Sequence, residues 1–198
     1  CVRIEFIDDP VINLNYSCSP VVNVTDETGV AVCPVNSRVE FYLQSTKSKR
    51  RVVLGAFVVQ PPKNLRSDLV LLRATPLDFL SNRAEITQLS DPKAVAAINI
   101  TRFLQALREH DSAKKEIEPF IDTAPVNRIR ITNALKDQLD VLTEDVSAGD
   151  FGSDQFLTKL KPFFDATART PISAQQAQTR LLNTLKAVRT GVYYGTPA

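Results

Sequence analysis

Short runs in the first third of the chain alternate between apolar and polar side chains. This alternation is typical of β-strands that bury one face. Turn-forming segments such as Asp8-Asp9-Pro10 separate the runs, and Pro61-Pro62 ends the pattern because proline cannot donate to a sheet. Six strands are predicted, over residues 2–7, 11–16, 21–24, 30–35, 38–43 and 52–59. They predict a small antiparallel β-sandwich or partial barrel over residues 1–62.

Beyond residue 62 the apolar residues recur at three- and four-residue spacing, which places them on one face of a helix. The main stripe follows Asp91 and Pro92, a favourable helix start, and consists of Ala96, Ile100, Phe103, Leu104 and Leu107. We therefore expect an α+β fold, with a helical module of four to five helices over residues 63–198. Its end, at Tyr193-Tyr194, reads as a candidate boundary to a further strand or domain.

Further helix starts can be identified in the second half of the chain. Thr132 or Asn133 should cap one helix and Ser153 another, in which Pro162 should cause a kink or a restart. Ser173 and Gln176 form a capping-box pattern at the start of the last helix.

Composition and charge are ordinary for a globular protein, at 43% hydrophobic and 23% charged residues. The net charge of +2 is spread along the chain, which argues against a nucleic-acid partner. We interpret the basic segment 47–51 as a solvated hairpin tip rather than a phosphate site. No apolar run reaches the roughly 18 residues that cross a bilayer.

Three cysteines suggest an exported protein. Cys18 and Cys33 can form a disulfide that closes a hairpin, which would add about 3 kcal/mol of stability and indicate an oxidising compartment. Two buried free thiols are the alternative. Cys1 is then left over, and it resembles the lipid-bearing cysteine of processed bacterial lipoproteins. We expect lipid attachment at Cys1, the alternative being that the chain simply begins there.

Residues that could carry chemistry are few. His110 is the sole histidine and has no second histidine with which to bind zinc, and no glycine-rich phosphate loop occurs. Asp8-Asp9 and Asp26-Glu27 are interpreted as solvated turn residues rather than calcium ligands. Asn99 lies at the edge of the main helical stripe and should be a hydrogen-bonded buried amide. We therefore expect no catalytic residue, no metal site and no cofactor.

Several motifs, taken in order, resemble those of proteobacterial exported surface lipoproteins of the adhesin type. The motifs are Thr25-Asp26 with Gly29, Val39 with Phe41, Leu54-Gly55, Thr75-Pro76-Leu77-Asp78, and Asn99 with Arg102-Phe103-Leu104-Gln105 and Leu107. A helix starting at Ser173 and the segment 191–195 continue the resemblance. Residues 110–115 replace an acidic glycine-rich loop of that family, so no calcium role is carried over. The resemblance implies a surface-anchored protein and no catalytic residues.

These observations favour a non-catalytic lipoprotein of the outer membrane, cell surface or periplasm that acts in binding, adhesion or assembly. Its expected partners are the membrane, through the lipid on Cys1, and another surface protein or copies of itself. One alternative is a fibre subunit that donates Val2, Ile4 and Phe6 to a neighbour by strand addition, although we expect this strand to close its own sandwich. Another is the non-catalytic N-terminal part of an exported hydrolase.

Overall fold

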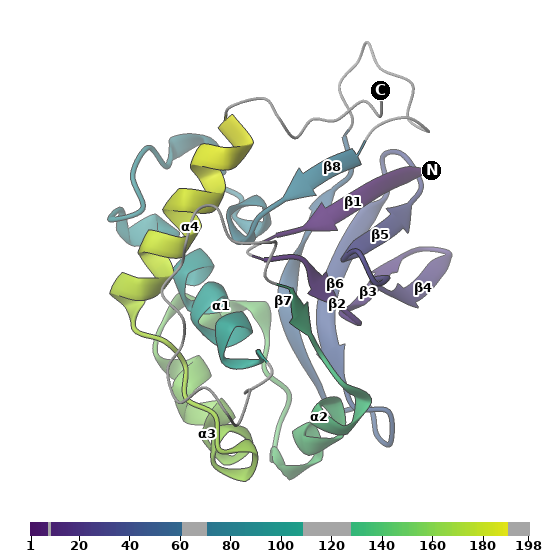
Figure 1. Cartoon of the computed structure of the whole chain (residues 1–198), viewed down its shortest axis with the longest axis vertical. Helices are drawn as coiled ribbons and strands as arrows, with labels where there is room; N and C mark the ends of the chain where they lie inside the picture. Colours follow the sequence, from purple (N-terminus) through teal and green to yellow (C-terminus); the bar gives the residue numbers. More distant parts are fainter. Residues whose placement is uncertain (8, 61–70, 109–127, 190–198) are drawn as a thin grey trace.

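A computed structural model describes residues 1–7, 9–60, 71–108 and 128–189, with side chains as far as residue 186. Figure 1 shows the β-sheets on one side of the molecule and helices α1, α3 and α4 on the other. The expected α+β fold, with antiparallel sheets at the N-terminus followed by helices, is confirmed.

The described strands form three sheets, of which two have three or more strands. Four antiparallel strands make up the larger sheet, in the order β4 (Val21–Val24), β3 (Asn15–Cys18), β6 (Arg38–Gln44) and β7 (Arg51–Val58). The smaller sheet has the order β5 (Val30–Cys33), β1 (Val2–Phe6) and β8 (Leu71–Ala74). β1 pairs antiparallel with β5 but parallel with β8, which lies beyond the predicted β-module.

The predicted strand over residues 11–16 is interrupted. Asn13 adopts a left-handed backbone conformation with φ of 64°, which asparagine tolerates better than most residues. This residue separates β2 (Val11–Ile12) from β3. β2 lies outside the larger sheet and pairs in parallel with β9 (Ile129–Arg130). The break therefore connects the β-part to a segment more than a hundred residues further along the chain.

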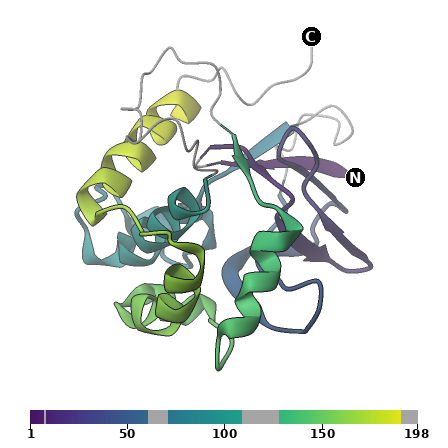
Figure 2. The same cartoon turned by 60° about the horizontal axis from the view of Figure 1, so that its bottom comes forward.

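Among the described residues the structure has four α-helices, which Figures 1 and 2 show from two directions. They are α1 (Val95–Ala106), α2 (Asn133–Asp137), α3 (Gln155–Thr167) and α4 (Ala174–Arg189). Short 3₁₀ turns occupy residues 76–79, 83–85, 92–94, 138–141 and 148–152. No helix within the described ranges is long and apolar enough to cross a membrane.

Three helix starts follow the local sequence signals, whereas the N-cap of α3 is Asp154 rather than the predicted Ser153, whose hydroxyl accepts from the Gln155 N–H. Asp91 accepts a hydrogen bond from the Lys93 N–H at 2.9 Å, and Thr132 caps α2 by accepting from the Leu135 N–H at 3.1 Å. Ser173 and Gln176 form the predicted capping box. Of the kink or restart predicted at Pro162, the restart is not found, since α3 continues through the proline as one helix. Leu160 and Phe163 flank the proline and are fully buried, so tertiary packing holds this helix together.

One hydrophobic core spans the predicted boundary at residue 62. Phe6 and Phe41 stack on each other between the sheets, and Phe103 and Phe163 from the helices belong to the same buried cluster. Phe79 completes the aromatic group and lies directly against Gly55, where an added Cβ would come within 2.5 Å of its ring. The predicted division at residue 62 therefore has no counterpart in the packing.

Candidate functional site

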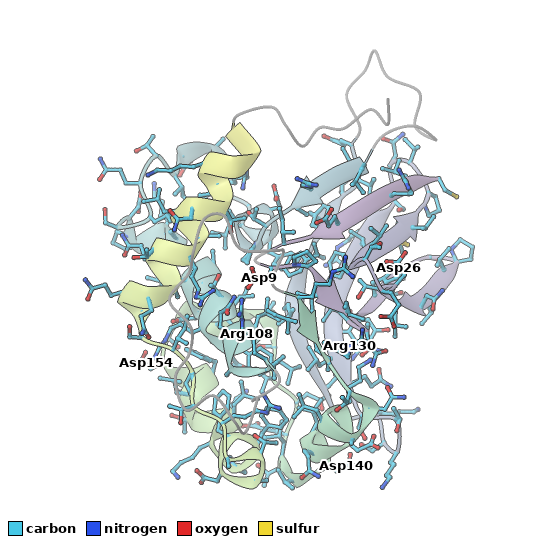
Figure 3. All side chains as sticks on the ribbon, in the orientation of Figure 1. Asp9, Asp26, Arg108, Arg130, Asp140 and Asp154 are labelled. Carbon is cyan, nitrogen blue, oxygen red and sulfur yellow. A yellow bond between two sulfur atoms is a disulfide. The ribbon has the colours of Figure 1, made fainter. Side chains whose placement is uncertain are left out.

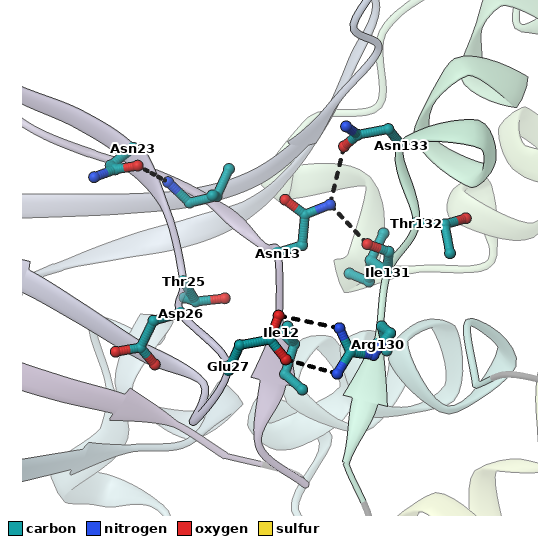
Figure 4. Close-up of a pocket in the computed structure, with 11 residues that line it drawn as sticks. Ile12, Asn13, Asn23, Thr25, Asp26, Glu27, Arg130, Ile131, Thr132 and Asn133 are labelled. Atoms are coloured by element: carbon teal, nitrogen blue, oxygen red, sulfur yellow. Dashed lines mark hydrogen bonds and ion pairs between the residues drawn. The ribbon is translucent and has the colours of Figure 1, made fainter.

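A groove opens where the β-part meets the segment that leads into α2. It has a volume of about 600 Å³. Figure 4 shows its floor at β2 and Asn13, with one wall from the end of β4 and the turn after it, and the other from β9 and the start of α2. We call it the asparagine groove. It is lined by Ile12, Asn13, Asn23, Val24, Thr25, Asp26, Glu27, Arg130, Ile131, Thr132 and Asn133.

Asn13 ties the floor of the groove to one wall. Its left-handed backbone turns the side chain toward β9 and α2, where Nδ2 donates to the Ile131 carbonyl at 2.7 Å and to Asn133 Oδ1 at 3.0 Å. The backbone pairing of β2 with β9 continues this connection, since the Ile131 N–H donates to the Ile12 carbonyl at 3.1 Å. Floor and wall are therefore held by both side-chain and main-chain bonds.

Thr25 and Asp26 shape the opposite wall. The Thr25 hydroxyl donates to the Val11 carbonyl at 2.6 Å and accepts from the Leu14 N–H at 2.9 Å. Asp26 Oδ1 accepts from the N–H groups of Thr28 and Val30, which closes the turn. Burial raises the pKa of Asp26, but these hydrogen bonds, with one from the Thr28 hydroxyl, outweigh it and leave the pKa below the ordinary value. The Asp26 carboxylate therefore stabilises its own turn through these hydrogen bonds.

The other charges of the groove are paired across it. Arg130 donates to both carboxylate oxygens of Glu27, at 3.1 and 2.6 Å. These hydrogen bonds, and then the guanidinium charge, lower the pKa of Glu27. Arg128 also donates to the Glu27 carbonyl, at 2.9 Å. The pair joins the two walls, and its charges are satisfied within the protein.

Two amide groups remain available in the asparagine groove. Among the residues that the structure describes, Asn13 Oδ1 and Asn133 Nδ2 have no hydrogen-bond partner, although the two amides are bonded to each other through their other atoms. Asn13 Oδ1 points toward the opposite wall (Figure 4). An acceptor and a donor are thus available on two amides that are bonded to each other, in a groove that Ile12 and Ile131 also line.

Cys33 ends β5 in the smaller sheet, opposite Val2, and Cys18 ends β3 in the larger sheet. Cys18 and Cys33 form a disulfide, as predicted from the sequence. The bridge joins β3 to β5 and so links the two sheets rather than closing a hairpin, because β4 pairs with β3 whereas β5 pairs with β1. Cys1 is a free, exposed cysteine that directly precedes β1.

The candidate strand-addition residues lie inside the molecule. Val2, Ile4 and Phe6 are fully buried, and their strand has a hydrogen-bonded neighbour on each side. This is the arrangement expected if β1 closes the sandwich of its own chain.

Asp9 differs from its prediction as a solvated turn residue. It is buried, and its carboxylate accepts from Gln105 Nε2 at 3.1 Å and pairs with Arg180. It also pairs with Arg108, and Figure 3 labels both Asp9 and Arg108. Two guanidinium groups compensate the cost of burying this carboxylate, which fastens the first turn of the chain to α1 and α4. Asp8 lies outside the described residues.

The remaining residues singled out in the sequence are either placed by ordinary structural contacts or lie outside the described residues. Asn99 is buried and donates to the Phe151 carbonyl at 2.8 Å, as predicted. Lys47 and Lys49 are exposed at the hairpin tip, while Arg50 pairs with Asp145 at 3.1 Å. His110 and Tyr193-Tyr194 lie outside the described residues. Within the described ranges, no cluster of three or more His, Cys, Asp or Glu side chains could hold a metal ion.

Comparisons with protein-family models, curated proteins and solved structures found no match. The asparagine groove itself was missed by the sequence reasoning. Asn13 lay in a run that was interpreted as one strand, and its contacts to Ile131 and Asn133 span 118 and 120 residues. The apolar pattern does not mark the break, so the one local signal is the residue type itself, since asparagine tolerates left-handed conformations better than most residues.

Proposed function

We propose that this chain is an exported, lipid-anchored surface protein that binds a neutral, hydroxyl-rich ligand such as a sugar in the asparagine groove. The observation that carries the proposal is the bonded amide pair of Asn13 and Asn133, which leaves one acceptor and one donor without a partner among the described residues.

The chemistry of the groove favours hydroxyl groups. A sugar hydroxyl donates one hydrogen bond and accepts others, so it can bond to Asn13 Oδ1 and Asn133 Nδ2 together. The charged side chains of Glu27 and Arg130 satisfy each other, which favours a neutral ligand over an ionic one. Ile12 and Ile131 supply apolar surface for the C–H groups of a sugar ring.

The cysteines support export and anchoring. The Cys18–Cys33 disulfide is typical of oxidising compartments, and it leaves Cys1 as the exposed free cysteine among the three. A lipid on Cys1 would hold the protein at the start of β1. Val2 lies opposite Cys33 and Glu5 opposite Val30, so the turn that forms one wall of the groove lies at the far end of β1. The groove would then face away from the membrane.

A titration followed by ¹⁵N NMR tests the binding proposal. The probes are glucose, galactose, mannose, N-acetylglucosamine and lactose, with glucuronate and glucosamine as charged counterparts. We expect at least one neutral sugar to shift the side-chain amide signals of Asn13 and Asn133, and its charged counterpart to bind more weakly.

Asn133 is exposed, so Asn133→Ala should fold normally and weaken binding by about 2- to 10-fold, the value of one hydrogen bond. Asn82→Ala is the control, because Asn82 lies outside the groove and makes no capping bond. If no neutral sugar perturbs the groove signals, or if Asn133→Ala binds as tightly as the wild type, the sugar-binding proposal is wrong.

A further inference from the structure

Among the strands that the structure describes, β4 is an edge strand of the larger sheet. Its one strand partner there is β3. Thr25, just after the strand, bonds through its N–H and its carbonyl to Leu14 and Asn13. Because these groups alternate in direction along an antiparallel strand, Asn23 also faces β3, whereas the main-chain groups of Val22 and Val24 face outward.

The other edges nearby are covered. At the opposite edge of the larger sheet, the Val53 N–H donates to the Val146 carbonyl at 2.9 Å, and the Val146 N–H donates to Arg51 at 3.1 Å. On β5, the Val32 N–H donates to the Tyr16 hydroxyl at 3.2 Å, and Val30 is bonded to Asp26. β4 has no such cover from a neighbouring segment among the described residues.

The side chains of β4 also suit pairing with another strand. Val22 is 70% exposed and Val24 36% exposed, and alternation places both on the same face. The strand contains no charged residue and no proline, which are the usual protections of an open edge. One outward main-chain group of the strand is occupied by a side chain, because Asn23 Oδ1 accepts from the Val24 N–H at 2.8 Å.

We propose that β4 is a docking strand for a second copy of this chain, with the two β4 strands antiparallel about a two-fold axis at Asn23. This register places Val22 opposite Val24 of the second copy, so their outward main-chain groups bond to each other and their side chains pack as a cross-strand pair. The Val24 N–H then exchanges Asn23 Oδ1 for a carbonyl of the second copy. The two Asn23 side chains meet at the axis, where each amide can donate to the other.

A second copy fits this edge better than an unrelated strand because the segment is self-complementary. A β-branched residue lies on each side of Asn23, and no charge on the strand repels its own duplicate. A four-residue junction buries far less than the roughly 1,200 Å² of standard interfaces. The dimer should therefore be weak and reversible.

Sedimentation velocity across about a hundredfold concentration range, up to about 1 mM, tests the proposal. We expect the average mass to rise toward that of a dimer. Val22→Lys should remain monomeric, because a charge would enter the junction, and it should fold normally because Val22 is exposed. Val58→Lys is the matched control, since Val58 is 49% exposed at the end of β7, and it should dimerise as the wild type does.

Cysteine cross-linking tests the register in a Cys1→Ser background. Asn23→Cys should oxidise to a linked dimer, because residues on the axis approach within disulfide distance. Val32→Cys, on the other sheet, should remain unlinked. Three results would each overturn the proposal: a constant monomer mass, dimerisation of Val22→Lys, or linking at residue 32 but not at residue 23. Any of them would mean that β4 binds a different protein or no partner.

Discussion

Lys136 is a buried lysine whose charge is strongly affected by the fold. It is only 2% exposed, and this burial lowers its pKa from 10.5 to about 8, against the opposing effect of Asp137. The unfolded chain keeps the ordinary lysine pKa and so binds more protons between the two values. Stability should therefore rise with pH through this interval.

Lys136→Met should remove this pH dependence and stabilise the protein near neutral pH, since it no longer buries an ammonium group. Urea unfolding at about pH 7 and about pH 9.5 measures both effects. Lys161→Met is the control, because Lys161 is exposed on α3. If Lys136→Met gains stability with pH as much as the wild type does, Lys136 is not the group responsible.

Residue-level predictions succeeded where the decisive contact is local. Asp91 bonds to Lys93 and Ser173 to Gln176, two and three residues away, so the sequence contains both partners of each cap. Asn13 could not be predicted in this way, because its role depends on Ile131. Asp9 was interpreted wrongly for the same reason, since Arg108 and Arg180 approach it only in the folded chain.

At the scale of elements, α1 is central because its buried residues belong to the same hydrophobic core as those of the sheets. Phe103 is fully buried on it and packs against the rings of Phe151 and Phe164, with centroids 5.8 and 6.2 Å away. Phe103→Ala should cost about 3–5 kcal/mol of unfolding free energy, the usual range for truncating a buried phenylalanine.

Urea melts of Phe103→Ala beside Leu182→Ala check this assignment. Leu182 is 43% exposed on α4, so its truncation should cost less than about 1 kcal/mol. Equal losses for the two variants would mean that α1 does not form the centre of the core.

The apolar patterns predicted elements well and their interruptions poorly. The stripe of α1 is found as expected, with Ile100, Leu104 and Leu107 buried. The run over residues 11–16 alternates without a gap in its apolar pattern, yet Asn13 divides it because β9 pairs with β2. At Pro162 the sequence suggested an interruption, but α3 continues as one helix through the proline, with Leu160 and Phe163 buried beside it.

For the whole molecule, the sequence predicted the α+β class but not how strands are shared between sheets. β8 and β9 come from beyond residue 62 and pair with β1 and β2, so the two predicted modules share sheets as well as a core. These pairings connect residues that are far apart in the sequence, and alternation alone carries no information about a strand's neighbours. The Cys18–Cys33 pairing was predictable, whereas its role as a link between sheets was not.

In the proposed function, this protein is exported and anchored through a lipid on Cys1, while Cys18 and Cys33 are joined in a disulfide. Non-reducing peptide mapping of the native protein, isolated from its membrane fraction, tests both parts in one measurement. We predict that the peptide containing Cys1 carries the added mass of a diacylglycerol-type lipid, and that the Cys18 and Cys33 peptides are recovered as a linked pair. An unmodified Cys1 together with free thiols at Cys18 and Cys33 would contradict the account.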